Sequence, residues 1–272
     1  MSGPTVPFLR AARTGAGGNR LPRRAARRAL QAVILAAGQG CRLNGNATPR
    51  PKCLYDVGGV PLLHHQLREL AGLGVHDVVI VVGFQEDRIR RAAGGAARFV
   101  SNDRFAETNS LWSFLLARPH VDTDVVIMNS DVYFHPELLT RLLAAAGDAL
   151  LYDSTSGHDD EHMKVSVRGT RLVSMAKDLP RARTQGENVG MLRLSQATAQ
   201  AVFDAGEEIV ARDGDLSWLA AAVSRVAATR PIECIDVAGL PWVEIDFPED
   251  LHRARTEIYP AVRGPWAQAG ER

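Results

Sequence analysis

Short apolar segments of strand length alternate with segments of helical periodicity along the first half of the chain. Residues 78–82 form an unbroken β-branched run, which is typical of a strand covered on both faces. Residues 61–73 place leucines at helical intervals behind Pro61, a residue suited to a first helical turn. By these criteria we expect strands at 32–37, 78–82, 98–101 and 124–128, and helices at 61–73, 85–93, 110–117 and 136–146. This alternation predicts a parallel sheet with helices on both faces.

The second half of the chain is less regular. Apolar runs predict strands at 149–152, 164–167, 172–176 and 189–194, and helices at 195–211, 217–227 and 248–257. The dipeptide Gly169-Thr170 is suited to closing a hairpin between two of these strands. We therefore expect a single α/β domain over residues 31–258, a Rossmann-like α/β/α sandwich with a mixed, mainly parallel sheet. Residues 259–272 are expected to form a C-terminal tail.

Residues 1–30 differ in composition from the rest of the chain. They hold seven arginines and no acid, they are rich in Gly, Pro and Ala, and they lack the apolar core of a secretory signal. Three interpretations stay open: a disordered basic tail, a start codon placed too early, or a weak tether to an anionic surface. The first two are favoured over the third, and the segment is set aside in reasoning about the fold.

Charge and cysteine content narrow the function classes. The chain has 32 Lys and Arg against 31 Asp and Glu, a net charge of +1, so setting aside the seven arginines leaves −6 for the remainder. A basic nucleic-acid-binding face is therefore not expected. No run reaches the roughly 18 apolar residues of a membrane span. The three cysteines, Cys41, Cys53 and Cys234, show no CxxC spacing, which argues against a disulfide framework or zinc and favours a cytoplasmic protein.

A glycine-rich turn follows the first predicted strand directly. Residues 36–43 read AAGQGCRL, and such a turn lets backbone N–H groups approach phosphate oxygens. A dinucleotide site would require GxGxxG at the start of a helix, but position 43 is Leu. Residues 44–51 are instead expected to form a long polar loop, which Pro51-Lys52-Cys53-Leu54 ends.

The full string LAAGxGxRL, seven further residues and PKxL resembles the signature of small-molecule nucleotidyltransferases. That family includes sugar-1-phosphate nucleotidyltransferases and phosphocholine cytidylyltransferases. Residues 101–113 (SNDRFAETNSLWS) resemble the bacterial phosphocholine branch, and residues 129–131 (NSD) resemble the family's metal-binding strand end. Residues 242–251 are similar to its WxEIDTPEDL segment, with Phe247 where Thr is usual. That Thr caps the following helix, so its loss moves the capping role to Asp246 or leaves the helix end less ordered.

The resemblance implies transfer of a nucleotidyl group from an NTP, with CTP favoured, to phosphocholine or a related phosphate or phosphonate. The acceptor oxygen attacks the α-phosphorus, and pyrophosphate leaves. Because that oxygen is already ionised near neutral pH, no general base is obligatory. Catalysis then consists of positioning and charge neutralisation.

The resemblance also implies the site residues. Arg42 and Lys52 are the expected catalytic cations, since arginine offers a planar fork to phosphate oxygens and lysine a point charge. The expected nucleotide-binding residues are Leu35, Ala36, Ala37, Gly38, Gly40, Arg42, Lys52, Gly83, Asn109 and Ser110. Asp131 and Asp246 each follow an apolar run and are expected to hold Mg²⁺. The alternatives are a turn residue for Asp131 and helix caps for Asp246 and Asn109.

The acceptor pocket is less defined. Its expected residues follow strands or lie in the second half: Tyr133, Asp153, Lys177, Glu187, Asn188, Trp242 and Glu244. Lys177 suits the acceptor's phosphate. Trp112 and Trp242 suit cation–π contact with a quaternary ammonium, with core packing as the alternative. The acidic stretch 158–162 contains two histidines, but we expect a solvated flap and no metal site there.

Other function classes fit less well. A sugar-1-phosphate nucleotidyltransferase is the main alternative within the family. An NDP-sugar-dependent glycosyltransferase would carry a D-x-D pair, whereas this chain reads Asp131-Val132-Tyr133. A glycosyltransferase would also have no use for the loop that carries Arg42 and Lys52. A non-catalytic relative would not be expected to keep both cations and both aspartates. The expected partners are an NTP and a phosphorylated small molecule, with no nucleic acid, and a homodimer is left open.

Overall fold

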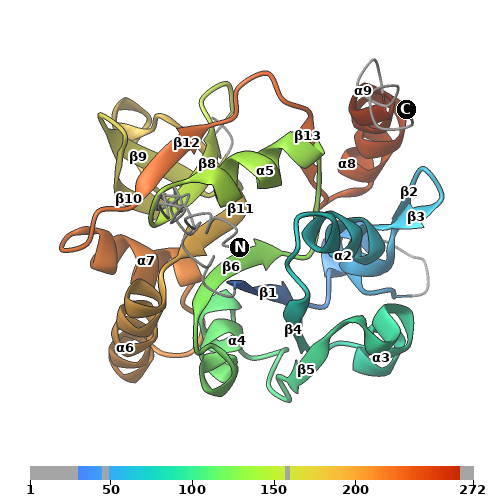
Figure 1. Ribbon diagram of the computed structural model, residues 1–272, viewed down its shortest axis with the longest axis horizontal. Coiled ribbons are helices and arrows are strands. Elements are labelled where there is room, and N and C mark those ends of the chain that lie inside the picture. Colours follow the sequence, from blue (N-terminus) through green and yellow to red (C-terminus); the bar gives the residue numbers. More distant parts are fainter. Residues whose placement is uncertain (1–29, 45–48, 157–159, 264–272) are drawn as a thin grey trace, which may run out of the picture.

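The computed structural model describes residues 30–44, 49–156 and 160–263 (Figure 1). Within these residues, nine strands form one sheet in the order β5-β4-β1-β6-β11-β8-β12-β10-β9. The strands are β1 (Leu30–Ala36), β4 (Asp77–Val82), β5 (Arg98–Ser101), β6 (Asp124–Asn129), β8 (Ala149–Asp153), β9 (Lys164–Arg168), β10 (Arg171–Ala176), β11 (Gly186–Leu194) and β12 (Glu233–Asp236). The predicted tails lie outside the described residues except for Leu30 and residues 259–263.

The sheet is mixed, as expected. Strands β5, β4, β1 and β6 pair in parallel, which is the arrangement that the strand–helix alternation predicts. Strand β12 also runs parallel to β8. The remaining pairs are antiparallel, because β11 runs against β6, β8 and β9, and β10 runs against β9 and β12. The parallel part of the sheet is thus its first half, and the carboxyl ends of β1, β4 and β6 share one edge.

Helices cover both faces, which confirms the α/β/α sandwich (Figure 1). Helices α2 (Leu62–Gly72), α3 (Glu86–Ala93) and α5 (Pro136–Ala144) bury one face. Helices α4 (Ser110–Leu116), α6 (Gln196–Asp213) and α7 (Leu219–Ala227) bury the other. Strand β1 shows why: Val33 points to the second face, while Ala32 and Ile34 point to the first, so its apolar run fills both cores.

Two short pairings lie outside the main sheet. Strand β2 (Asp56–Val57) pairs with β3 (Val60–Pro61), and β7 (Val132–Phe134) pairs with β13 (Trp242–Glu244). The second pairing extends through a backbone hydrogen bond of 3.0 Å from Ile245 N–H to the Asp131 carbonyl. It therefore brings the segment that precedes the last helices against the end of β6.

The carboxyl-terminal segment departs from the single helix expected at 248–257. Helix α8 (Pro248–Arg253) continues through a π-helical segment (Ala254–Ile258) into α9 (Tyr259–Arg263). Ala254 and Ile258 pack in a third apolar cluster with Leu43, which lies in the one-turn helix α1 (Cys41–Asn44). The carboxyl-terminal helices thus support the glycine-rich loop. No helix among the described residues has the length and apolar character needed to cross a membrane.

Candidate active site

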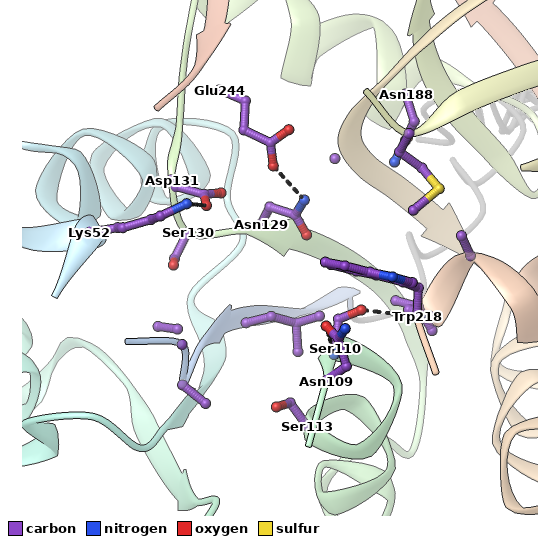
Figure 2. A pocket seen from close by; sticks show the side chains of 18 of the residues that line it. Lys52, Asn109, Ser110, Ser113, Asn129, Ser130, Asp131, Asn188, Trp218 and Glu244 are labelled. Carbon is purple, nitrogen blue, oxygen red and sulfur yellow. Dashed lines mark hydrogen bonds and ion pairs between the residues drawn. The ribbon is translucent and has the colours of Figure 1, made fainter. Parts of the chain in front are cut away.

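A cavity of about 390 Å³ opens where the carboxyl ends of β1 and β6 meet β11, α4 and α7 (Figure 2). Most of the residues expected from the sequence line it: Leu35, Ala36, Ala37, Gly38, Gly40, Arg42, Lys52, Asn109, Ser110, Asp131, Lys177, Asn188, Glu244 and Asp246. The cavity therefore collects, at one edge of the sheet, side chains that are up to 211 positions apart between Leu35 and Asp246.

Charged groups from the glycine-rich loop and from the two strand ends meet in this cavity. The Lys52 ammonium lies between the two aspartates, 3.1 Å from Asp131 Oδ2 and hydrogen-bonded to Asp246 Oδ1. The Arg42 guanidinium donates from Nη2 to Asp246 Oδ2 at 2.6 Å. Although burial opposes it, the two aspartates raise the pKa of Lys52. The two cations and two aspartates predicted from the sequence thus form one ion-pair cluster.

Local structure fixes the direction of Lys52. A short 3₁₀ turn spans Lys52–Leu54 and buries Cys53 and Leu54 in the core. The Lys52 side chain therefore points to the opposite side of the turn, which faces the cavity. It passes over Gly40, which has a φ of +60°, and a Cβ built there would lie 2.6 Å from Lys52 Cγ. Glycine is therefore needed at position 40 both for its backbone conformation and for the passage of the lysine.

Three carboxylates lie together beside Lys52. One oxygen from each of Asp131, Glu244 and Asp246 lies within 4.8 Å of the others. Pairing of β13 with β7 sets Glu244 opposite Val132, next to Asp131, and Asn129 Nδ2 donates to Glu244 Oε1 at 3.4 Å (Figure 2). Burial, followed by the nearby aspartates, raises the pKa of Glu244 well above its usual range. Such crowding of hard oxygen donors fits a divalent cation such as Mg²⁺.

The pKa of Asp246 moves in the opposite direction. Burial would raise this pKa, but the charges of Lys52 and Arg42 hold it below its usual value. The helix-capping role considered for Asp246 belongs instead to Asp250, whose Oδ2 accepts from the backbone N–H of Asp246 at 3.0 Å and of Phe247 at 2.8 Å. The Asp246 carboxylate is therefore directed at the cations. The Phe247 ring lies against the Arg42 guanidinium, and Arg42 Cζ is 4.8 Å from the centroid of the ring.

The described part of the acidic stretch that was expected to be a solvated flap, residues 160–162, contacts the site through Glu161. Glu161 is half exposed, yet its Oε2 accepts from Arg42 Nη1 at 2.6 Å and from Lys177 Nζ at 3.2 Å. Those two bonds lower the pKa of Glu161. His162 Nδ1 lies 3.3 Å from Glu187 Oε2, whereas His158 lies outside the described residues. Sequence reasoning missed Glu161 because exposed acids in a polar run carry no pattern.

Asn109 and Ser110 line the cavity and also hold a neighbouring loop. Asn109 Oδ1 accepts from the Ser110 N–H at 2.8 Å, so Asn109 is the N-cap of helix α4, the role considered as an alternative to nucleotide binding. Its Nδ2 donates to the Leu216 carbonyl at 3.2 Å. Ser110 Oγ accepts from the Leu219 N–H at 3.0 Å. The loop held in this way presents Trp218, whose indole projects into the cavity above Ser110 (Figure 2).

Trp218 is a cavity residue that the sequence did not reveal. It is 43% exposed, and the Lys177 ammonium lies 5.0 Å from its ring centroid. The tryptophans expected to contact a ligand lie elsewhere. Trp242 is buried and donates from Nε1 to Asp153 Oδ2 at 2.8 Å, and the Trp112 ring lies 5.0 Å from the Arg104 guanidinium carbon. Core packing, the alternative interpretation, therefore describes Trp242.

Five expected site residues do not line the cavity: Gly83, Tyr133, Asp153, Glu187 and Trp242. A Cβ at Gly83 would lie 2.7 Å from Phe105 Cβ and 2.9 Å from the Ala37 carbonyl, so this glycine lets two loops approach behind the cavity. Tyr133 packs in the third apolar cluster. Glu187 is buried and accepts from Ser156 Oγ. These five residues pack next to the cavity, and contact between any of them and a substrate stays a prediction.

Comparison with known proteins identifies the family. Residues 32–203 match the MobA-like NTP transferase domain. The chain belongs to this family. It is 33% identical over 247 residues to the CMP-5′-(3-aminopropyl)phosphonate synthase of Streptomyces rubellomurinus, covering 85% of this chain and 39% of that protein. It is 30% identical over 253 residues to the bifunctional IPC transferase and DIPP synthase of Rubrobacter xylanophilus, covering 90% and 54%.

A further relative and a solved structure are also similar to this chain. The chain is 35% identical over 101 residues to the choline-phosphate cytidylyltransferase of Streptococcus pneumoniae, covering 36% of this chain and 43% of that protein. It therefore spans about half or less of the length of these curated relatives. The solved inositol-1-phosphate CTP transferase from T. maritima has the same fold, with a TM-score of 0.71 and 22% identity over 85% of this chain and 94% of that one.

Proposed function

We propose that the protein is a Mg²⁺-dependent nucleotidyltransferase that couples CTP to a phosphorylated small molecule. The observation that carries this proposal is the meeting of Arg42 and Lys52 with Asp131 and Asp246 in one cavity. The CTP- and CMP-related names of the relatives support cytidine as the base. A cavity at the carboxyl edge of parallel strands is also where α/β folds bind nucleotides.

The reaction needs cations around the phosphates and little else. An oxygen of the acceptor phosphate or phosphonate forms a bond to the α-phosphorus, and the bond from that phosphorus to the bridging oxygen breaks, releasing pyrophosphate. Arg42 and Lys52 stabilise the charge that spreads over the phosphate oxygens. Backbone N–H groups around Gly38 and Gly40 contribute to binding the triphosphate.

The carboxylates supply the metal site in this proposal. Asp131 and Asp246 would hold Mg²⁺, and Glu244 lies close enough to contribute a third carboxylate. Bound Mg²⁺ supplies positive charge to the phosphates and helps to orient them. Lys52, which lies between the two aspartates, would contact the α-phosphate.

The cavity favours a small acceptor with few hydroxyl groups. Its inner end is lined by apolar side chains: Leu150, Met163, Met175, Leu192 and Val223. Lys177 and Asn188 also line the cavity, and they suit the acceptor's phosphate and polar atoms. A hexose or inositol ring would leave several hydroxyl groups without partners at the apolar end, which costs free energy. Phosphocholine and aminoalkylphosphonates fit this description better than sugar phosphates.

A pyrophosphate-release screen tests the proposal. Four NTPs are crossed with phosphocholine, 2-aminoethylphosphonate, inositol-1-phosphate and hexose-1-phosphates, with and without Mg²⁺, and Asp131→Asn serves as the inactive control. We expect release with CTP and an amine-bearing acceptor, and none after chelation of Mg²⁺. Silence with every combination would refute the activity, and release with hexose-1-phosphate alone would replace the acceptor class by sugar phosphates.

A further inference from the structure

Two cations from distant parts of the chain meet on one carboxylate oxygen at the partly exposed side of the cavity. Glu161 Oε2 accepts a hydrogen bond from Arg42 Nη1 at 2.6 Å and another from Lys177 Nζ at 3.2 Å. Arg42 comes from the glycine-rich loop, and Lys177 follows strand β10. All three residues line the cavity. The single oxygen therefore marks a point that both a guanidinium and an ammonium can reach.

A phosphate oxygen makes the same contacts as this carboxylate oxygen. It is anionic, and it binds a guanidinium and an ammonium with similar geometry. We propose that Glu161 occupies a subsite for a substrate phosphate or phosphonate oxygen, between Arg42 and Lys177, and that binding of the substrate displaces it. This inference rests on the proposed function for the identity of its ligand. Glu161 would thus act as a built-in competitor of the substrate.

The position of Glu161 suits a group that leaves when an anion arrives. A carboxylate that stayed beside the bound phosphate would repel it. The Glu161 side chain is 52% exposed, so it can turn into water at little cost. The backbone next to it is fixed, since the Met163 carbonyl accepts from the Asn188 N–H at 2.8 Å. Displacement therefore requires rotation of one side chain and no movement of strand β9.

Both cations keep other contacts when Glu161 is removed. Arg42 donates to Asp246 at 2.6 Å and lies over the Phe247 ring. Lys177 lies over the Trp218 ring at 5.0 Å. Neutralising Glu161 should therefore leave the subsite in place and more positive, so anions should bind more tightly. If Glu161 instead served to position the two cations, the same change would weaken binding, and the sign of the effect separates the two roles.

The test compares wild-type protein with Glu161→Gln by isothermal titration calorimetry, without turnover. Separate titrations use inorganic pyrophosphate and CTP for the donor, and inorganic phosphate and phosphocholine for the acceptor. The matched control is Asp178→Asn, which removes the same charge from an exposed residue next to Lys177 in the sequence. We expect Glu161→Gln to bind at least one of these anions about two- to tenfold more tightly, and Asp178→Asn to bind them as the wild type does.

Each outcome decides the inference. A gain with pyrophosphate and CTP assigns the subsite to the donor, and a gain with phosphate and phosphocholine assigns it to the acceptor. Unchanged or weaker binding by Glu161→Gln, or an equal gain in Asp178→Asn, overturns the inference. Thermal melting checks that both variants are folded. Because no turnover is needed, tighter binding together with a silent pyrophosphate-release screen would refute the proposed function and leave the anion subsite standing.

Discussion

The Phe247 ring offers a test of how Arg42 is held in the site. Arg42 Cζ lies 4.8 Å from the ring centroid, while its Nη2 donates to Asp246, the residue before the phenylalanine. Phe247→Leu keeps apolar bulk under the guanidinium and removes the aromatic face. The helix cap should survive the change, because Asp250 accepts the N–H groups of residues 246 and 247 through its own carboxylate.

The structure sets the size of the expected effect. The Arg42 side chain is 43% exposed, so the cation–π contact belongs to the weaker, solvated class, worth about 0.5–1 kcal/mol. That free energy corresponds to a factor of about two to five in affinity. Arg42 is proposed to stabilise the charge that spreads over the phosphate oxygens in the reaction. Phe247→Leu should therefore lower kcat/KM for CTP by this factor.

A double-mutant cycle with Arg42→Met isolates the contact. Initial rates of pyrophosphate release are measured for the wild type, both single variants and the double variant, with Phe247→Tyr as a control that keeps the aromatic face. If the ring acts through Arg42, Phe247→Leu should have no further effect in the Arg42→Met background, and Phe247→Tyr should behave as the wild type does. An equal loss in both backgrounds would refute the reasoning.

Three further predictions concern activity and pH. Lys52→Ala and Asp131→Asn should each lower pyrophosphate release by two or more orders of magnitude while circular dichroism shows a folded protein; near-normal turnover in either would show that its role is misassigned. The raised pKa of Glu244 means that the folded protein binds this proton more tightly than the unfolded chain does, so without divalent ions stability should fall as pH rises above the normal carboxyl range. In chelator, the difference in Tm between Glu244→Gln and the wild type should therefore be larger at pH 8 than at pH 5. Each kcal/mol of unfolding free energy that the wild type loses should appear as about 2–4 °C in Tm. Identical pH profiles for the two proteins would contradict this. Burial lowers the pKa of His65 to about 4, so as pH falls the unfolded chain takes up this proton before the folded protein does. The free energy of unfolding should therefore fall by up to about 3 kcal/mol between pH 6.5 and pH 4. In urea titrations His65→Gln should lose this part of the pH dependence, and a pH dependence equal to that of the wild type would count against the prediction.

The parts of the fold that the sequence predicted are those with a long periodic pattern. The β-branched run at 78–82 and the leucines of helix α2 each carry enough positions to distinguish strand from helix. The glycine-rich loop was found for a different reason, because its motif fixes the spacing between Arg42 and Lys52. From these features came the α/β/α sandwich, the parallel first half of the sheet and the two cations of the ion-pair cluster, whereas Asp131 and Asp246 were found because each follows an apolar run within a stretch that resembles the family.

The parts that were missed depend on contacts between distant segments. Strands β7 and β13 have three residues each, too few for any alternation to show, and they form only because they pair with each other. Strand β12 was likewise not expected, although it lies inside the main sheet. Trp218 follows the same rule. Its sequence neighbours predict the start of an apolar helix. It lines the cavity because its loop is held by hydrogen bonds that Asn109 donates to Leu216 and that Ser110 accepts from Leu219.

The carboxyl-terminal quarter of the chain completes the site that the matched domain begins. The family match ends at residue 203, whereas Trp218, Glu244 and Asp246 come later in the chain. Asn109 and Ser110 hold the loop that presents Trp218, whereas Glu244 and Asp246 reach the cavity because β13 pairs with β7 next to Asp131. The three-carboxylate cluster therefore requires the last quarter of the chain to be in place against β7. Weakening the β7–β13 pairing should reduce both stability and affinity for the proposed Mg²⁺, whereas Asp246→Asn should reduce the affinity for Mg²⁺ far more than the stability.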